Sequence, residues 1–431
     1  MSSLARGRSN RARRARAEHG FTLVELMVAM VGAMFVGIAV FTLAKHSASF
    51  YSRESRLADA TLQSLVGFER LRSDIARAGF LGTPNIIKDP RLCGDPRDAS
   101  WPEWLARLSS VTIEPVPPEQ IDTPQFAEIS PRRVILTGSF VSADQFEVRT
   151  IFDSNPIKIV LEPTSLGMAN IGYPGAQTAA TLSRVFQTGR ALRIVDDVGR
   201  IQFGVIANVT GGAEPTIVLA SAPALQFRAS SALNCGVGNL AAGYTVNVVN
   251  IIRYDVQDIS GDSRFTALFK AGGPSYEATR RDLVREELDV HGDPIDGTRE
   301  LVAEYAVDLD FSLLVERDRS SSLERVTGAA TDAFAGDPAS AALAVTGPQM
   351  IRGVQTWLSV RSQEADRLVA LNVDTAGANT TRLRVNVMTG SDDVVSEVEV
   401  DKWLVSAPAY ARVRTLQSTI SLNNQVNLTW Y

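Results

Sequence analysis

Residues 20–25, Gly20-Phe21-Thr22-Leu23-Val24-Glu25, lie between an arginine-rich head and a long apolar run. The apolar run extends from Phe21 to Ala44, and Glu25 is the only charged residue in it. A carboxylate near the centre of a bilayer-spanning helix costs roughly 2.5–3.5 kcal/mol on insertion scales. A charge that is kept at such a cost indicates that Glu25 has a function.

The apolar run is long enough to be a membrane anchor. Its 24 residues would form a helix of roughly 36 Å, which exceeds the hydrocarbon thickness of a bilayer. The basic head before it predicts a cytoplasmic N-terminus. No Ala-x-Ala-like cleavage site follows between Ala44 and Ser49, so the sequence predicts a retained single-pass anchor in the inner membrane, with the later residues outside the cytoplasm.

The basic leader, the glycine, the phenylalanine and Thr-Leu-Val-Glu together resemble the class III signal of type IV pilins and type II secretion pseudopilins. The resemblance implies that a prepilin peptidase cuts between Gly20 and Phe21 and then N-methylates Phe21. Glu25 would become the fifth residue of the mature chain and pair with the terminal amine of a neighbouring subunit. The alternative is an ordinary signal anchor with a chance glutamate.

The residues after the anchor predict that its helix continues. No proline occurs from Lys45 to Phe80. Apolar residues recur mostly at three- and four-residue steps, with charged residues between them, as in an amphipathic helix. The apolar residues are Leu57, Leu65, Phe68, Leu71, Ile75 and Ala78, and the charged ones include Arg53, Glu54, Arg56, Glu69, Arg70 and Asp74. One helix is therefore expected from about residue 22 to residue 79.

Beyond Pro84 the pattern changes to short runs of β type that are broken by Gly, Pro, Asn and Asp. These runs predict strands in the following segments: 133–136, 146–151, 157–161, 201–206, 216–219, 244–254, 307–315, 354–361, 382–388 and 413–422. Two other segments, 101–104 and 277–288, are predicted as short helices or loops.

The predicted fold class is α+β, with a long membrane-spanning N-terminal helix packed on a mainly antiparallel β-sheet head. The predicted division is a leader at 1–20, a transmembrane part at 21–44, an amphipathic helical part at 45–79 and a head at 80–431. A boundary between two lobes of the head is predicted near 230–243, where small and turn-forming residues cluster.

Charge and cysteine content restrict the function classes. Without residues 1–20 the chain has 37 basic and 47 acidic residues, a net charge of about −10, which argues against nucleic acid as the main ligand. The only two cysteines, Cys93 and Cys235, predict one disulfide in an oxidising compartment. Two unrelated buried thiols are the alternative.

The chain lacks the motifs of common catalytic sites, including Gly-x-Ser-x-Gly, His-Glu-x-x-His, Cys-x-x-Cys and the P-loop. We therefore expect no enzymatic activity and no cofactor. Asp289, Asp293 and Asp296 cluster in Asp-Val-His-Gly-Asp-Pro-Ile-Asp-Gly and are a weak calcium candidate. Their spacing is not that of an EF-hand, and a solvated turn is the favoured interpretation.

Three further segments resemble the PilW-type minor pilins of type IV pili. They are the end of the long helix at 68–82, a strand at 301–311, and the closing strands at 354–362 with 412–424. The resemblance implies a low-copy subunit that primes pilus assembly and stays at the pilus tip on the cell surface. The implied partners are the prepilin peptidase, other minor pilins, the major pilin, the inner-membrane assembly platform and a tip adhesin.

Two other functions remain open from the sequence. The first is the type II secretion minor pseudopilin of the J kind, which is similar to the PilW kind. The second is a membrane-anchored periplasmic adhesin or enzyme. Residues 85–130 do not fit the minor-pilin pattern and look like an insertion, which could serve adhesion.

Overall fold

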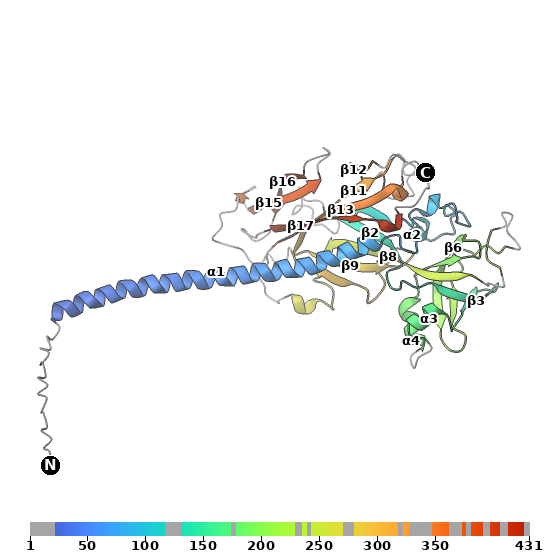
Figure 1. The fold of residues 1–431 in the computed structure, drawn as a ribbon, viewed down its shortest axis with the longest axis horizontal. Helices are drawn as coiled ribbons and strands as arrows, with labels where there is room; N and C mark the ends of the chain where they lie inside the picture. The colour runs from blue at the N-terminus through green and yellow to red at the C-terminus, as the bar shows by residue number, and fades with distance from the viewer. Residues whose placement is uncertain are drawn as a thin grey trace, which may run out of the picture. The chain divides into compact units, whose positions relative to one another are not determined.

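The computed structural model defines one long helix and a β-rich head (Figure 1). It divides into two compact units, Met1–Asp59 and Ala60–Tyr431, and each is considered by itself. The described residues are 22–116, 131–173, 178–228, 235–238, 243–269, 280–317, 322–327, 331, 334, 347–361, 373–375, 381–390, 397–405 and 413–425. The predicted leader, residues 1–20, lies outside them.

Helix α1, Leu23–Arg77, confirms the prediction of one continuous helix from about residue 22 to residue 79. Its first part, Leu23–Ala48, has a mean hydropathy of 2.5 and is long and apolar enough to cross a membrane. The helix ends where Gly79 takes a φ of +77°, a conformation that favours glycine. The Gly79 amide then donates to Thr137, and Asn424 Nδ2 donates to the Ala78 carbonyl oxygen (3.1 Å).

Most of the described head is antiparallel sheet. The first ten strands are β1 (Val111–Pro115), β2 (Arg132–Gly138), β3 (Phe146–Phe152), β4 (Lys158–Leu161), β5 (Ala191–Val195), β6 (Ile201–Thr210), β7 (Thr216–Leu219), β8 (Thr245–Gln257), β9 (Asp282–Leu288) and β10 (Glu300–Ala303). Their order is β1-β2-β8-β3-β4-β7-β6-β5, with β9 on β8 and β10 on β9. Because β5 also pairs with β8, strands β8, β3, β4, β7, β6 and β5 form a closed ring.

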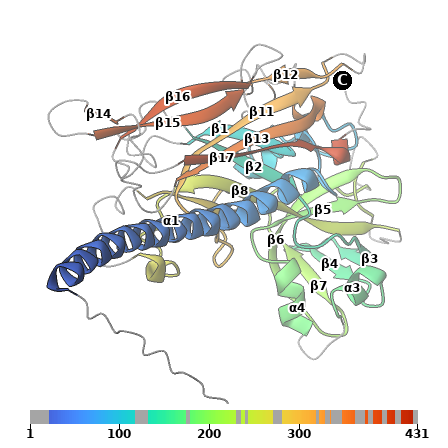
Figure 2. The same cartoon turned by 60° about the vertical axis from the view of Figure 1, so that its left-hand side comes forward.

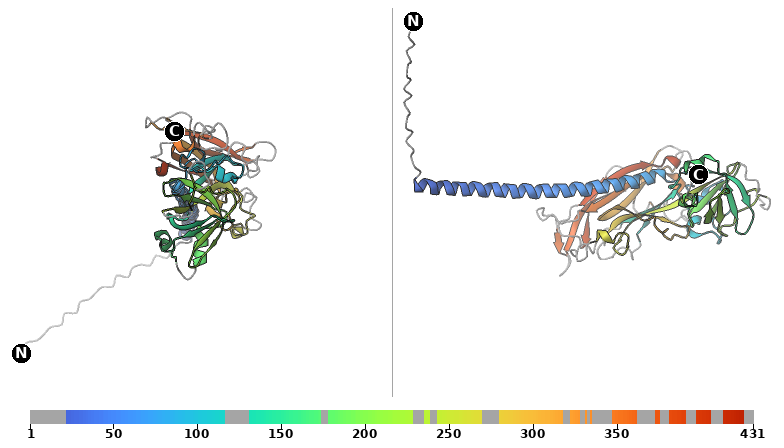
Figure 3. Two further views of the ribbon diagram at one scale, coloured as in Figure 1. Left: turned by 90° about the vertical axis from the view of Figure 1, so that its right-hand side faces the viewer. Right: turned by 90° about the horizontal axis from the view of Figure 1, so that it is seen from below.

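Strand β8 belongs both to the ring and to the open sheet. Its N-terminal half pairs with β3 and β5, whereas its C-terminal half pairs with β2 and β9. The ring is drawn in green at one end of the head in Figure 3, and β15 and β16 lie at the other end. The predicted lobe boundary near 230–243 precedes β8 and stays a prediction, because 229–234 and 239–242 lie outside the described residues.

Two smaller sheets complete the described head. Strands β11 (Ala306–Val315), β12 (Glu324–Val326), β13 (Ile351–Arg361) and β17 (Val413–Ser421) form one sheet in the order β12-β11-β13-β17. Strands β14 (Val373–Thr375), β15 (Thr381–Gly390) and β16 (Glu397–Val405) form the other. The described helices of the head are short: α2 (Glu103–Ala106), α3 (Leu166–Asn170) and α4 (Thr178–Val185). The α+β fold class is confirmed, and so are the predicted strands.

One predicted segment takes a different form, and strands β1, β5, β12, β14 and β16 were not predicted. Residues 282–288 form β9, a strand between β8 and β10, where a short helix or a loop was expected. Four of its seven residues are charged, so the sequence shows no apolar run typical of a buried strand. All seven are nevertheless buried, because each charged side chain meets an oppositely charged partner. The 101–104 segment leads into α2, as predicted.

The core of the open sheet contains the last turns of α1. Phe68, Leu71, Ile75 and Ala78 pack among apolar residues of β1, β2, β8, β11 and β13, and Figure 2 shows this part of α1 against the strands. A second core fills the ring, and a third joins the segment around Ile86 and Leu105 to the outer face of β5 and β6. Leu65, which the sequence placed on the buried face of the helix, is 41% exposed.

Candidate processing and assembly site

The candidate site begins at the first turn of α1. Gly20 and Phe21 lie outside the described residues, whereas Thr22 and Glu25 are described. The Thr22 backbone amide and the Thr22 hydroxyl both donate to Glu25 Oε2, at 3.0 Å and 3.1 Å. The Glu25 amide donates in return to Thr22 Oγ1 at 3.2 Å. This reciprocal arrangement is a capping box, which satisfies amides at a helix start that have no intrahelical partner.

The capping box explains how a carboxylate can be kept at the start of an apolar helix. Two donors of Thr22 satisfy one oxygen of Glu25, and the helix dipole favours negative charge in the first turn. Among the described residues, none donates to the other oxygen, Oε1. The site therefore combines a carboxylate fixed by its own chain with one oxygen open to a donor from outside.

The helix behind this site presents an apolar surface in all directions. Large side chains from Leu23 to Leu43 are at least half exposed, for example Leu23 at 74% and Phe41 at 71%. A Cβ added at Gly32 or Gly37 would meet nothing within 4 Å. A helix that is apolar all round is typical of a segment that is covered by lipid or by other helices.

At its other end α1 is fixed to the head by a buried carboxylate. Asp74 is 1% exposed and accepts hydrogen bonds from Arg285 Nε (2.7 Å) and from the Tyr254 hydroxyl (2.8 Å). Burial and the neighbouring Asp74 raise the pKa of Tyr254 well above its usual value, so the phenol remains a donor. The sequence placed Asp74 among the exposed charges of the helix, and the structure corrects this.

Close packing fixes the same part of the helix. Gly67 faces β10, and a Cβ at this position would lie 1.9 Å from the Val302 carbonyl oxygen. Farther along, Arg77 Nη2 donates to the Ser139 carbonyl oxygen (2.9 Å). The helix segment that follows Ala60 is thus held by a glycine contact, a buried ion pair and a capped end.

The two cysteines meet in the structure. Cys93 and Cys235 form a disulfide with 5.9 Å between their Cα atoms, and 142 residues separate them in the sequence. The Cys93 amide donates to Ile201 of β6, and Leu92 forms a parallel bridge with Ile201. The disulfide therefore fastens the 85–108 segment, which the sequence marked as an insertion, to the loop before β8.

The three aspartates proposed as a weak calcium site lie in the turn that follows β9. Asp289 Oδ1 accepts hydrogen bonds from the backbone amides of His291 (2.8 Å) and Asp293 (3.0 Å). Its carboxylate thus stabilises the turn itself. Within the described ranges no group of three or more His, Cys, Asp or Glu side chains is arranged to hold a metal ion, and Asp296 is not part of one.

Sequence reasoning missed two residues of the site. Thr22 could have been identified from the Thr-x-x-Glu spacing before an apolar run, which is the sequence signature of a capping box. Asp74 lies three residues after Leu71 and one before Ile75, so its position on the buried face of the helix was the available signal.

Comparison with known proteins supports the N-terminal site. Residues 15–31 match the family model described as the prokaryotic N-terminal methylation motif. No curated protein and no solved structure matches the chain. The match includes the leader end, Gly20, Phe21, the capping box and the first turns of the apolar helix. The chain therefore carries a type IV pilin-like prepilin signal at its N-terminus, which implies processing by a prepilin peptidase and association with the membrane.

Proposed function

We propose that this chain is a minor pilin of the PilW kind, which is cleaved and N-methylated and then helps to initiate a type IV pilus at its tip. The observation that carries the proposal is the position of Glu25. It lies in the first turn of an apolar helix, inside the methylation motif, with one carboxylate oxygen left open among the described residues. A terminal ammonium of a neighbouring subunit would neutralise this charge in lipid, where both charges are costly when they are unpaired.

The size of the head supports a position at the tip. The unit that starts at Ala60 contains three sheets in its described part, including a closed ring inserted between β2 and the end of β8. A large head would obstruct regular packing along a fibre but is tolerated at its end. The proposal includes an inner-membrane precursor with a cytoplasmic N-terminus, and a role in assembly without enzymatic activity or a cofactor.

The proposed partners follow from the proposed role. The peptidase recognises the segment around Gly20. The apolar helix contacts the assembly platform, other minor pilins and the major pilin. A tip adhesin would contact the head. The type II secretion pseudopilin of the J kind would have the same N-terminal chemistry. Presence of the protein in surface pili sheared from cells would support the pilus, and confinement to the cell envelope would favour the secretion machine.

Intact mass of the membrane-extracted protein tests the processing step. We expect a mature chain that begins at Phe21 and carries one methyl group. Gly20→Leu should leave the full precursor, whereas the control Ala12→Leu, which changes the leader away from the cut, should be processed normally. A mature chain of normal mass from Gly20→Leu would overturn the assignment of the cleavage site.

A further inference from the structure

Asp255 in β8 is a buried carboxylate that the proposed function does not use. It is 1% exposed, and neither of its carboxylate oxygens has a hydrogen-bond partner among the described residues. A buried polar group without a partner is rare and costly, and an ionised carboxylate is the costliest kind. Its position therefore calls for a physical explanation.

Two arginines whose charges act on Asp255, Arg133 and Arg253, are each engaged with another acid. Arg133 of β2 donates through Nε to Glu114 Oε2 at 2.9 Å. Arg253, two residues before Asp255 on the same face of β8, donates through Nε to Glu286 Oε1 at 2.9 Å. The antiparallel register of β2 and β8, which pairs Val134 with Tyr254, puts Arg133 across from Asp255, and both arginines are paired with another acid.

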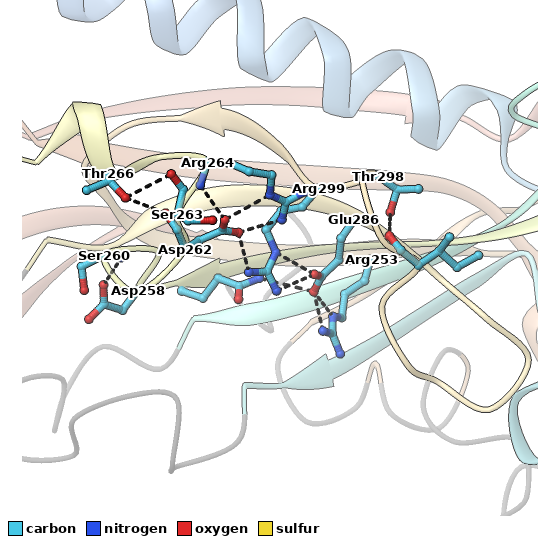
Figure 4. Close-up of polar contacts among 12 residues, drawn as sticks. Arg253, Asp258, Ser260, Asp262, Ser263, Arg264, Thr266, Glu286, Thr298 and Arg299 are labelled. Carbon is cyan, nitrogen blue, oxygen red and sulfur yellow. Dashed lines mark hydrogen bonds and ion pairs between the residues drawn. The ribbon is translucent and has the colours of Figure 1, made fainter. Parts of the chain in front are cut away.

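Glu286 is the centre of a longer network (Figure 4). Arg253 and Arg299 both contact its carboxylate, and Arg299 Nη1 also reaches Asp262 Oδ2 at 3.2 Å. Asp262 in turn pairs with Arg264 Nη2 at 2.7 Å. This chain of ion pairs fastens the 258–269 segment, which follows β8, to β9 and to the end of β8.

We propose that the Asp255 carboxyl is a proton-operated switch in the head. When it is uncharged, Arg133 and Arg253 remain with Glu114 and Glu286, as in the structure. When it is charged, Asp255 competes with those two acids for the same arginines and weakens the network that holds the 258–269 segment. The inference does not depend on the proposed pilus function, since it concerns the sheet alone.

The surroundings of Asp255 favour the uncharged form of its carboxyl in the folded protein. Burial raises the pKa of Asp255 from 3.8 to about 6; Arg253, Arg133 and the adjacent Val256 amide oppose this shift, and Glu286 adds to it. On β9, Asp282 is the other acid on this face, and it is bonded to Arg280 at 2.9 Å. The folded state therefore binds the Asp255 proton more tightly than the unfolded state, so the contribution of Asp255 to stability is lost as pH rises from about 3.8 to about 6 and does not change further above that.

The test compares wild type with Asp255→Asn, which imitates the uncharged carboxyl. Urea unfolding of the full-length protein in detergent is measured at pH 4.5 and at pH 7.5. We expect Asp255→Asn to be the more stable protein at pH 7.5. The unfolding equilibrium constant of wild type, divided by that of Asp255→Asn, should be larger at pH 7.5 than at pH 4.5. The increase should be about tenfold or more, since a difference of one pKa unit corresponds to tenfold.

Asp258→Asn is the matched control, because Asp258 is close in sequence but 43% exposed and paired with Arg281 at 3.5 Å. The ratio of unfolding equilibrium constants between wild type and Asp258→Asn should change less between the two pH values than the ratio between wild type and Asp255→Asn. An infrared difference spectrum at pH 5 gives an independent readout: wild type should show a protonated carboxyl band that Asp255→Asn lacks. A ratio that does not change with pH, an Asp255→Asn protein that is less stable or unfolded at pH 7.5, or the absence of the band would each overturn the proposal.

Discussion

At the residue scale, two carboxylates on one helix are kept in environments where carboxylates are costly, and they are satisfied in different ways. Glu25 obtains its donors from Thr22 on its own chain, three residues before it. Asp74 obtains them from Tyr254 and Arg285, which are remote in sequence. The first can exchange partners without unfolding the head, whereas the second cannot. Glu25 is therefore suited to exchange partners during assembly, whereas Asp74 is suited to hold the end of the helix on the head.

Replacement of Glu25 tests its assembly role. We expect Glu25→Ala and Glu25→Gln to be cleaved normally but recruited poorly into pili, because both remove the charge that would pair with a terminal amine. Thr22→Val should be recruited into pili better than either Glu25 variant, since it removes two of the three capping contacts but leaves the carboxylate. Immunoblots of sheared pili and membrane fractions measure both steps. Unchanged recruitment of Glu25→Ala would contradict the pairing role.

Replacement of Asp74 tests the helix anchor. Asp74→Ala removes the closer and more buried of the two acids paired with Arg285, and breaking a buried ion pair in this way typically costs about 3–5 kcal/mol. The free energy of unfolding, measured by urea titration of the full-length protein in detergent, should fall by that amount. Glu69→Ala on the same helix is the control, because its pair with Arg72 is exposed and contributes about 0–1 kcal/mol. Equal effects of the two variants would show that Asp74 is not an anchor.

At the scale of elements, α1 is positioned by backbone approach as well as by side chains. Gly67 is a point of close approach, since any Cβ there would meet the Val302 carbonyl oxygen of β10. The helix cannot move away without losing the Asp74 contacts about two turns later. The part of the helix that belongs to the head is therefore held at two points along its length.

Gly67→Ala should destabilise the head although alanine is the better helix former. Helix propensity alone favours alanine by about 1 kcal/mol, whereas overpacking costs about 1–3 kcal/mol and here involves backbone atoms. We expect a net fall in the free energy of unfolding in urea. Gly32→Ala, where a Cβ meets nothing within 4 Å, makes the same chemical change and should leave head unfolding unaltered. A stabilised Gly67→Ala protein would contradict the close contact.

The disulfide between Cys93 and Cys235 also holds elements of the head together. The Cys93→Ser/Cys235→Ser variant should be less stable than wild type by about 2–5 kcal/mol, because a long loop of the unfolded chain is no longer closed. Denaturant midpoints of the non-reduced proteins measure the difference. Wild type treated with reductant under native conditions should approach the double variant. If reductant and mutation both leave the midpoint unchanged, the bond does not form in the folded protein.

At the scale of the whole molecule, the sequence predicted what depends on local pattern. The long helix followed from periodicity and from the absence of proline, and most strands followed from β-type runs between turn residues. Strand β5, strand β9 and the closure of the ring did not, because they depend on pairing between remote segments. The N-terminal signal was predictable from residues 20–25, whereas the burial of Asp74 and Asp255 depends on strands that the sequence could not place.

The ring and the open sheet share strand β8, so we expect them to unfold together. Arg190, before β5, makes two hydrogen bonds of 2.7 Å to Glu287 of β9, and Asn250 of β8 donates to the same carboxylate at 2.6 Å. The ring and the open sheet therefore share one strand and one buried ion pair. We expect one cooperative transition, with the same midpoint by tryptophan fluorescence and by far-UV circular dichroism.

Glu287→Ala sharpens this test, because it leaves Arg190 buried without its partner at the junction of the ring and the open sheet. The expected loss is about 3–5 kcal/mol, and both probes should shift together. The control Glu162→Ala removes an acid whose contact with Arg149 is partly exposed and lies within the ring, so its effect should be about 0–1 kcal/mol. Two separate transitions, in wild type or in Glu287→Ala, would mean that the ring folds independently and that β8 does not couple it to the sheet against which α1 packs.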